Sequence, residues 1–550
     1  MSYLSGNNPG RLEKWEEESG RTISEALAGL SPRRRLTILL SVGVVTAIEI
    51  SNRISINVLL PDMQGNVAAS SDTISWVIIL YNLGFLCSLV LSAWMTRVIG
   101  SRSHLLYSVL LYSIGAIGCA SSSHSLNLLL VSRVVMGFGG GAFLVRTVIL
   151  SGLMFPGKAR INAVTWLYGV LFIFQISYPV TIGWIDETFA WHYAFLLDFP
   201  FLILGTILIW KFVPPGLLYE RREQSRVDIW GAGLLIAALS SLQIASSRGE
   251  RDEWLDSPLI VVTLVVAVLC FLAFVWWETR LENLAPVLHL RIIARQVALR
   301  ASFSVVMIVG AILGAGLYVL PQYLRFVQDY SAAQTGGFIS VYTTGLGAGL
   351  VLSLRVLLPR FGGRATMAFG MLLLIVACTA FIYIWTPTTP AAVLIPAIFL
   401  QSLGLAPILL GAANVATGTA SLPDLNDVST TYFFVRQLGN TFGVTAATVI
   451  FDHRMTLHSS RLLDVANRLD PTVQSTLSQY AALIARKGGA NSNPALGALQ
   501  LFQANIITQS RLLSYIDIYF FLAVLAAVAL VLLAVARLER SSMVTHFHLW

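Results

Sequence analysis

The amino-acid sequence predicts an all-α polytopic membrane protein with about 14 transmembrane helices. Of its 550 residues, 56% are hydrophobic and only 12% are charged, and the mean hydropathy is +0.74. Soluble domains carry roughly 25% charged residues, so this composition excludes an ordinary soluble protein. The net charge of +8 gathers in particular loops. We interpret it as a signal of membrane topology, and we expect no nucleic-acid partner.

Apolar runs of about 20 residues, long enough to cross a bilayer, recur along the whole chain. We expect spans at 37–60, 74–96, 104–122, 126–153, 161–184, 191–213, 229–247, 258–278, 299–321, 336–358, 365–385, 391–416, 428–451 and 514–537. Two stretches interrupt this series. Residues 214–228 form a charged linker, and residues 452–513, rich in Ala, Leu, Gln and Ser, are typical of soluble helices at the outer surface.

The simplest partition places two extra helices between two six-helix bundles. The predicted divisions are a cytoplasmic N-terminal segment 1–36, an N-terminal bundle 37–213, a cytoplasmic linker 214–228, two inserted helices 229–280, a C-terminal bundle 281–537 with the external segment 452–513, and a cytoplasmic tail 538–550.

Positive charge alternates with the spans and predicts the orientation of the chain. Arginine and lysine gather on one side, at Arg33–Arg35, Arg97, Arg102, Lys158, Arg160, Arg221, Arg222, Arg226, Arg291, Arg295, Arg360, Arg364, Arg537 and Arg540. The opposite loops carry Asp62, Asp72, Asp186 and Glu187, a stretch of mixed charge at 248–254, and the uncharged link 386–390. The positive-inside rule therefore places both termini in the cytoplasm, although the predicted cytoplasmic loop 421–427 lacks positive charge.

The first apolar run carries two ionisable residues at membrane depth, Glu49 and Arg53. Such a side chain costs on the order of 3 kcal/mol to insert, so it is rarely without a role. Glu49, Asn52, Arg53 and Asn57 are spaced three or four residues apart and therefore share one broad helix face. We expect that face to look inward, towards protein or water.

Several local patterns carry a family resemblance. They are Ser55-Ile-Asn57-Val-Leu-Leu-Pro61, Trp94-Met-Thr-Arg97-Val-Ile-Gly100-Ser-Arg102, Arg133-Val-Val-Met-Gly137-Phe-Gly-Gly-Gly141, Tyr178-Pro179-Val-Thr-Ile-Gly183, Leu320-Pro321-Gln322 and Arg436-Gln437-Leu-Gly439-Asn-Thr-Phe-Gly443. In number, order and spacing they resemble the major facilitator superfamily, in its fourteen-span drug:proton antiporter branch (the EmrB/QacA type). The resemblance covers residues 40 to 540 and implies the major facilitator fold.

The chain departs from the family pattern at its charged positions. The first-helix acid of the family would fall at Asn52, which cannot take up a proton. Met136 follows the fourth-helix arginine where a polar residue is usual, and Tyr178 replaces a motif glycine. Asp198 stands where a sixth-helix asparagine is common, and Thr96 stands where many relatives carry aspartate.

Two readings of Glu49 stay open. In the first, Glu49 has taken over the proton-carrier role vacated at Asn52, because burial and a changing environment let a carboxyl exchange a proton. In the second, Glu49 and Arg53 form a fixed ion pair that only orients the helix.

Further candidate residues lie on the fourth, fifth and sixth spans. The resemblance implies that Arg133 tunes the proton affinity of the acid, and we expect it to approach Glu49 or Asn57. The alternative is that Arg133 is a static, hydrogen-bonded arginine of the core. Asp198 is a second candidate for the proton or a cation. Arg146 binds an anionic substrate or snorkels to the interface. The predicted substrate-facing set is Asn52, Arg53, Asn57, Arg146 and Gln175.

The gating candidates are small or charged residues at helix contacts. Gly137 and Gly141, Pro179 and Gly183, and Gly439 and Gly443 are spaced one turn apart, which allows close helix approach, with Arg436 opening the last motif. The resemblance implies that the fifth-helix motif seals an outer contact; ordinary packing is the alternative. A functional interpretation of Arg97, Gly100 and Arg102 is a cytoplasmic contact that locks the two bundles together. The alternative is that this short cytoplasmic loop simply carries positive charge.

The four cysteines lie apart and without nearby histidines, so we expect neither a metal site nor a disulfide framework. We also expect no cofactor. No phosphate-binding glycine motif and no nucleophile with a paired base is visible, so we expect no ATP-driven or enzymatic activity. The resemblance implies proton-coupled export of lipophilic or amphipathic compounds by alternating access in a bacterial inner membrane, with a periplasmic adaptor and an outer-membrane channel as further partners. The alternatives are a dedicated exporter of one metabolite, siderophore or lipid with an anionic cargo, and a non-transporting receptor.

Overall fold

The computed structural model describes residues 30–67, 71–123, 125–155, 157–214, 228–249, 254–280, 297–418, 425–466, 470–487 and 493–535. Within these ranges every regular element is helical and none is a strand. In a bilayer a backbone satisfies its own hydrogen bonds most simply as an α-helix, so long apolar runs give this result. The predicted all-α class is confirmed.

The helices fall into three groups along the chain. The N-terminal half contains α2 (Pro32–Asn66), α3 (Ser71–Ala120), α4 (Leu126–Met154), α5 (Gly157–Thr188), the 3-10 helix η1 (Trp191–Leu197) and α6 (Asp198–Phe212). The inserted helices are α7 (Ile229–Arg248) and α8 (Pro258–Glu278), with the short η2 (Trp254–Asp256) between them. The C-terminal half contains α10 (Val297–Phe326), α11 (Ala332–Leu352), the π-helical turn η3 (Ser353–Leu357), α12 (Leu358–Ile384), α13 (Ala391–Gly418), α14 (Leu425–Val465), α15 (Pro471–Lys487) and α16 (Pro494–Val535).

Two glycines mark the same turn in both halves. Gly100 kinks α3 into two legs, with φ 79° and ψ 156°, and Gly362 kinks α12 near its start, with φ 75° and ψ 175°. Only glycine adopts such angles without a steric penalty. Each lies between the second and the third membrane-crossing leg of its half, so the two halves repeat one architecture.

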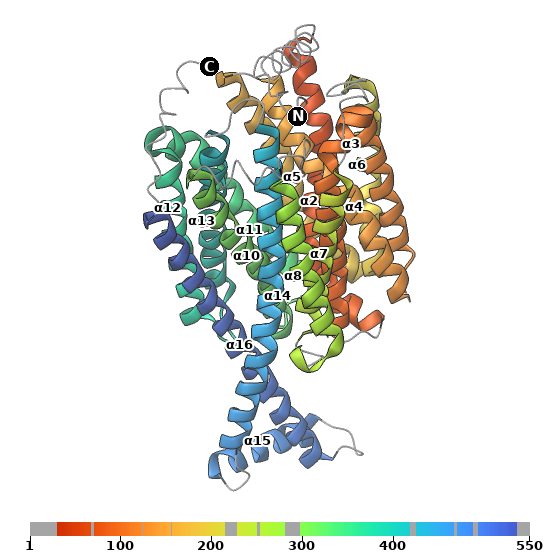
Figure 1. Cartoon of the computed structure of the whole chain (residues 1–550). Helices are drawn as coiled ribbons and strands as arrows, with labels where there is room; N and C mark the ends of the chain where they lie inside the picture. The colour runs from red at the N-terminus through yellow and green to blue at the C-terminus, as the bar shows by residue number, and fades with distance from the viewer. Residues whose placement is uncertain are drawn as a thin grey trace.

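Among the described residues, ten helical segments are long and apolar enough to cross a membrane, and one of them, Ala332–Ile384, contains both α11 and α12. Two shorter apolar helices, Trp76–Ser92 and Ile229–Ala245, are counted in addition to these segments. α14 also runs through the bundle, packed against α10 (Figure 1). Counted in this way, the helical legs agree with the prediction of about 14 spans.

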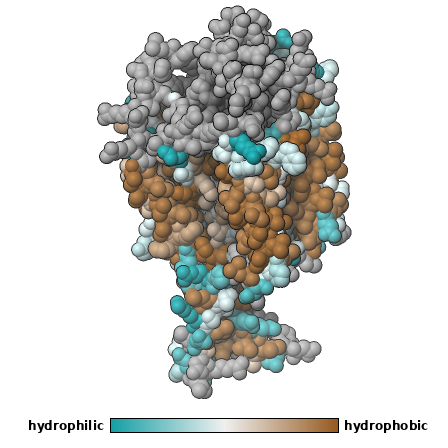
Figure 2. Space-filling model, in the orientation of Figure 1, coloured by the Kyte–Doolittle hydropathy of each residue, from teal (hydrophilic) through white to brown (hydrophobic). Residues whose placement is uncertain are grey.

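Figure 1 shows α3, α4 and α6 on one side of the bundle and α12 and α13 on the other. α15 and the adjoining ends of α14 and α16 project beyond one end of the bundle; we call them the projecting segment. Figure 2 shows a broad band of hydrophobic side chains on this face of the bundle and more hydrophilic ones where the projecting segment joins it. Exposed apolar residues such as Trp210, Val262 and Leu269 belong to the surface of the bundle. Such a surface suits contact with lipid.

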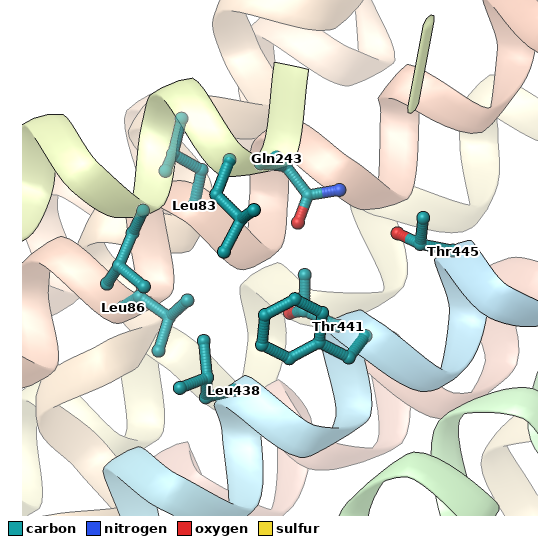
Figure 3. A pocket seen from close by; sticks show the side chains of 9 residues that line it. Leu83, Leu86, Gln243, Leu438, Thr441 and Thr445 are labelled. Atoms are coloured by element: carbon teal, nitrogen blue, oxygen red, sulfur yellow. The ribbon is translucent and has the colours of Figure 1, made fainter. Parts of the chain in front are cut away.

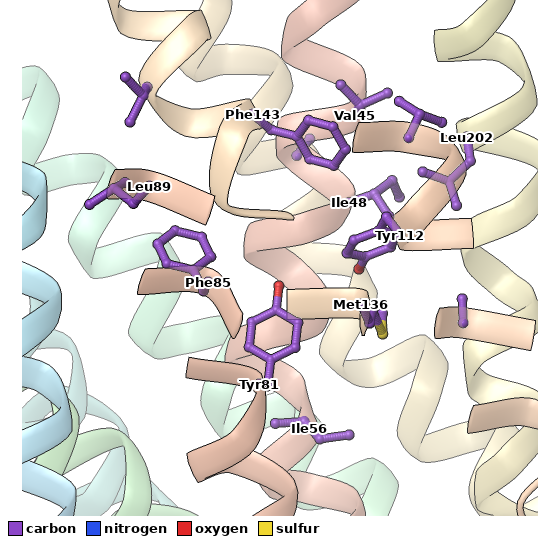
Figure 4. Packing of buried hydrophobic residues seen from close by; sticks show 14 of the residues in the cluster. Val45, Ile48, Ile56, Tyr81, Phe85, Leu89, Tyr112, Met136, Phe143 and Leu202 are labelled. Carbon is purple, nitrogen blue, oxygen red and sulfur yellow. The ribbon is translucent and has the colours of Figure 1, made fainter. Parts of the chain in front are cut away.

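The buried apolar residues form two separate clusters. One is built mainly by α2 to α6 and the other by α10 to α16. Figure 4 shows part of the first, where Tyr81, Phe85, Tyr112, Met136 and Phe143 surround the middle of α2. Each half therefore has its own core, and the polar residues described next lie against the first of them.

Candidate functional site

Glu49 of α2 is fully buried and makes all its close polar contacts through one oxygen. Nε of Arg53, one helical turn later, lies 3.0 Å from its Oε1. The hydroxyl of Tyr81 on α3 donates a hydrogen bond of 3.0 Å to the same oxygen. Oε2 has no hydrogen-bond partner within the described part of the chain. The Arg53 contact is an ion pair by distance, because Nε lacks hydrogen-bond geometry towards any acceptor there.

Asp198, the first residue of α6, is also fully buried but is well supplied with donors. Tyr178 of α5 donates to Oδ1 at 2.6 Å. The Asn52 amide donates to Oδ2 at 3.1 Å, and the Tyr112 hydroxyl approaches Oδ2 at 3.4 Å. Both oxygens therefore accept hydrogen bonds. The structure brings Asp198 to the residue where the family acid is missing, Asn52.

Arg133 of α4 lies between these two carboxylates. Its Nε donates to the Val77 carbonyl at 3.1 Å, and its Nη1 contacts Asn52 Oδ1 at 3.4 Å. Its guanidinium stacks 4.3 Å from the centre of the Tyr81 ring. In the described residues no hydrogen bond or ion pair joins Arg133 to Glu49 or to Asn57, because Tyr81 stands between Arg133 and Glu49. The expected direct approach is replaced by a contact through this aromatic ring.

Four of the five departures from the family pattern gather at one place, and Thr96, which contacts Ser92 and His104, lies apart from them. Asn52 and Tyr178 both bond Asp198, while Met136 Sδ lies 3.5 Å from Arg133 Nη1. Four substitutions scattered over four helices are thus neighbours in space. Asn52, Tyr178 and Asp198 form one hydrogen-bonded set, and Met136 adjoins it through Arg133.

Arg53 also reaches the C-terminal half. Its Nη1 donates to Oε1 of Gln437 on α14 at 2.9 Å, and Gln437 Nε2 donates to Oδ1 of Asn82 on α3 at 3.1 Å. The guanidinium lies 4.7 Å from the centre of the Phe85 ring. Glu49 is therefore linked to α14 through a single side chain. Sequence reasoning gave no role to Tyr81, and it quoted Gln437 only as part of the motif that begins at Arg436, without a partner.

The other predicted substrate-facing residues lie elsewhere. Arg146 is buried in the N-terminal half and donates to the Ser92 carbonyl at 3.0 Å. The Asn57 amide donates to the carbonyl of Ile54 on its own helix, and its Oδ1 has no partner among the described residues. Gln175 is buried, and its carbonyl accepts from Thr343 of α11. Asn52 and Arg53, which are neighbours in the sequence, therefore both contact the polar residues around Glu49 and Asp198, whereas Arg146 does not.

The predicted gating glycines serve two different contacts. Gly137 and Gly141 lie against the α3 backbone, and Gly439 and Gly443 lie against α10, so these pairs pack helices within one half. By contrast, the α5 motif lies between the halves: a Cβ on Gly183 would be 2.6 Å from the Ala332 carbonyl oxygen of α11.

Further contacts between the halves lie at the end from which the projecting segment emerges. Arg325 Nη2 of α10 pairs with Asp62 Oδ2 of α2 at 2.6 Å, and the Ala333 amide donates to Glu187 at 2.7 Å. At the opposite end, Arg102 lies 5.6 Å from the Trp210 ring centre, beside the Gly100 turn. The Arg97 side chain lies outside what the structure describes. Arg436 lies 5.3 Å from the Phe433 ring centre.

A pocket lies between α3, α7 and α14. Apolar side chains dominate its wall, with Gln243, Thr441 and Thr445 as polar members (Figure 3). None of the predicted substrate-facing residues lines it. Among the residues that the structure describes, no three or more His, Cys, Asp or Glu side chains form a cluster suited to a metal ion.

Comparison with known proteins agrees with this architecture. The model of the major facilitator superfamily matches residues 42–444. Multidrug export protein EmrB of Escherichia coli K12 is 24% identical over 505 residues, covering 90% of this chain and 94% of EmrB. Fatty acid resistance protein FarB of Neisseria gonorrhoeae is 24% identical over 493 residues, covering 86% of this chain and 90% of FarB. The predicted resemblance to EmrB-type proteins is confirmed.

Solved structures give the same fold at low sequence identity. A bacterial homologue of the human lysosomal transporter Spinster aligns with TM-score 0.55 and 15% identity, covering 92% of this chain and 98% of that one. The peptide transporter POT aligns with TM-score 0.56 and 12% identity, covering 91% and 95%. At such identities the likeness concerns the fold alone.

Proposed function

Since the chain belongs to the major facilitator superfamily, we propose that it exports lipophilic or amphipathic small molecules in exchange for protons. The cargo class is supported by the similarity to a multidrug export protein and a fatty acid resistance protein. The two halves, each with its own core, support transport by alternating access, in which the halves rock about a midplane site. The predicted location is a bacterial inner membrane, with both termini in the cytoplasm.

The observation that carries the proposal is the unequal environment of the two Glu49 oxygens. Oε1 is held by Arg53 and Tyr81, while Oε2 is buried without a partner among the described residues. A buried carboxylate with such an oxygen is costly to keep charged, and a proton on Oε2 neutralises it. The Tyr81 hydrogen bond to Oε1 can remain, while the ionic attraction of Arg53 weakens. Glu49 is accordingly the proton carrier, and the Arg53 pair does not prevent loading.

Asp198 and Arg133 have supporting roles in this scheme. Asp198 accepts hydrogen bonds on both oxygens from Tyr178 and Asn52, so in this scheme it is the acid that holds Asn52 in place. Arg133 acts on Glu49 through the Tyr81 ring, which it faces while the Tyr81 hydroxyl holds Oε1. Removing the Asp198 charge therefore disturbs the position of Arg133 and Asn52 rather than removing the transported proton.

Transport by the purified full chain in proteoliposomes tests the proposal. Lipophilic dyes of either charge and neutral dyes serve as cargo, and an internal pH indicator reports proton movement. Glu49→Gln is expected to abolish proton movement coupled to dye efflux. Asp256→Asn, which removes an exposed carboxylate, is the matched control and should behave as the wild type. Full coupling in Glu49→Gln would show that the Glu49–Arg53 pair is fixed and that Glu49 is not the carrier.

A dedicated exporter of an anionic metabolite or lipid is the second candidate, favoured by two arginines near the junction of the halves. Arg436 lies next to Gln437, the residue that Arg53 contacts, and its Nε has no hydrogen-bond partner in the described chain. Arginine suits carboxylate and phosphate groups because of its planar donors. Counterflow with carboxylate-bearing and cationic dyes separates the candidates, since only the dedicated carrier excludes cations.

A periplasmic adaptor protein, with an outer-membrane channel, is the proposed protein partner. The projecting segment supports this, because it exposes leucines well beyond the hydrophobic band; they are Leu463, Leu483, Leu496, Leu499 and Leu501. Replacing Leu496 and Leu499 by serine should lower efflux from intact cells and leave transport in proteoliposomes unchanged. Equal effects in both assays would contradict the adaptor.

A further inference from the structure

We propose that Gln437 is the positioning residue through which the protonation of Glu49 changes the packing of the two halves. This inference rests on the proposed function, in which Glu49 takes the proton. It assigns the step that follows: how a proton bound within α2 is sensed by α14, a helix of the other half.

The chain of contacts is short and crosses between the halves twice. Glu49 lies 3.0 Å from Arg53, Arg53 donates to Gln437 at 2.9 Å, and Gln437 donates to Asn82 at 3.1 Å. Gln437 and Asn82 are buried, with 2% and 4% of their surface exposed. Gln437 thus lies on α14 between α2 and α3, and both amide ends are used on the N-terminal half.

The orientation of the Gln437 amide depends on Arg53. A guanidinium has only donors, so the amide oxygen must face Arg53. The amide nitrogen then faces Asn82, whose oxygen accepts its hydrogen bond. Neither an apolar side chain nor a carboxylate at this position can make both contacts, because the first has neither group and the ionised second has no donor.

The charged and titratable groups that face Glu49 are Arg53 on its own helix, Tyr81 of α3, Arg436 of α14 and Arg133 of α4. Arg53 is the one in ion-pair contact, so neutralising Glu49 weakens the attraction that holds Arg53 towards α2. Within α2 the Glu49–Arg53 pair is local, four residues apart, and does not itself hold the halves together. Arg53 keeps its stacking on Phe85 and its bond to Gln437, and these become its main partners once the charge of Glu49 is gone. The Arg53–Gln437 bond between the halves is therefore stronger when Glu49 is neutral than when it is charged. Such a difference between two states couples protonation to the packing of the halves.

The experiment measures movement and protonation separately, on the purified full chain without cargo. Spin labels replace Tyr107 on α3 and Phe361 on α12, which are 56% and 64% exposed, after substitution of the native cysteines. Distances between the labels are recorded from about pH 5 to about pH 9, because burial raises the pKa of carboxyl groups above its usual range. The infrared band of a protonated carboxyl that Glu49→Gln removes reports the Glu49 proton. Gln437→Leu is expected to keep that band and to lose at least about half of the pH-driven change in distance populations.

Gln437→Glu is the second variant, because it preserves size and the acceptor towards Arg53. It should shift the midpoint of the movement, since its charge competes with Glu49 for Arg53, and it keeps the test valid if Gln437→Leu does not fold. The role of Gln437 would be overturned if both folded variants showed the same change in label distance, with the same pH midpoint, as the wild type. It would also be overturned if Glu49 of the wild type took up its proton without any change in label distance. Absence of the Glu49 band in the wild type would instead refute the proposed proton carrier, so the two failures are distinguishable.

Discussion

The hydroxyl of Tyr178 lies 2.6 Å from Oδ1 of Asp198, and it joins two positions at which this chain departs from its family. One lies in the middle of α5 and the other at the start of α6. A phenol supplied by one helix thus stabilises a buried carboxylate supplied by the next, beside Asn52 of α2. A carboxylate on α6 therefore lies beside Asn52, the position where the family resemblance leads us to expect an acid.

Tyr178→Phe should destabilise the protein, because it leaves a buried carboxylate oxygen without its shortest hydrogen bond. Bonds to charged groups contribute about 1.5 to 3 kcal/mol, so a clear drop in unfolding temperature is expected. Tyr383→Phe is the matched control, since Tyr383 is 82% exposed. Thermal unfolding in detergent measures both, and equal curves would contradict the importance of this bond.

Exchanging the acid and the amide should restore what each single change removes. Asn52→Asp places two carboxylates within hydrogen-bond distance, and Asp198→Asn leaves the Asn52 amide without its carboxylate acceptor. The double variant regains one acid and one amide at the same contact, which is 3.1 Å long in the native protein. Coupled dye efflux should fall at least about tenfold in each single variant, equivalent to about 1.4 kcal/mol, and recover in the double variant. Additive losses would show that the two positions act independently.

Gly183→Ala should weaken the contact between α5 and α11, because the added methyl carbon would lie 2.6 Å from the Ala332 carbonyl oxygen. Backbone atoms cannot yield as a flexible side chain can, so the halves must separate there. Gly169→Ala on the same helix meets nothing within 4 Å and serves as control. Hydrogen exchange at residues 332–340 should rise in the first variant and stay unchanged in the second. Equal hydrogen exchange in the two variants would show that the α5 motif does not help to close this end.

Asp62→Asn should loosen the same end, but less than Gly183→Ala does. The ion pair to Arg325 joins α2 to α10, and the two side chains are 36% and 16% exposed. Pairs with this much exposure contribute about 0 to 1 kcal/mol, and salt weakens them further. Hydrogen exchange at the start of α11 should therefore rise slightly at low salt and match the wild type at high salt. A large effect that salt does not change would contradict this ranking.

The sequence was sufficient for the fold because apolar length and loop charge directly report membrane crossings. It also predicted the contact between Glu49 and Arg53, since residues four apart on a helix are neighbours. It could not place Gln437, which lies 384 positions after Arg53 and meets it only when the two halves pack. Tyr81 was missed for a similar reason: a tyrosine in an apolar helix gives no sign of the carboxylate it bonds.

The departures at Asn52, Met136, Tyr178 and Asp198 were visible in the sequence, but their meaning was not. Each alone indicates only a weakened motif. Their contacts around Arg133 and Asp198 make them one rearranged site. Several departures from one family pattern on neighbouring helices are a signal that sequence reasoning can use.

The most direct test of the central claim is the infrared difference spectrum between low and high pH, in the purified wild type, Glu49→Gln and Asp198→Asn. If Glu49 takes the proton on its unpartnered oxygen, a protonated-carboxyl band appears in the wild type, is missing in Glu49→Gln and persists in Asp198→Asn. A band that remains in Glu49→Gln and vanishes in Asp198→Asn would contradict the account and assign the proton to Asp198.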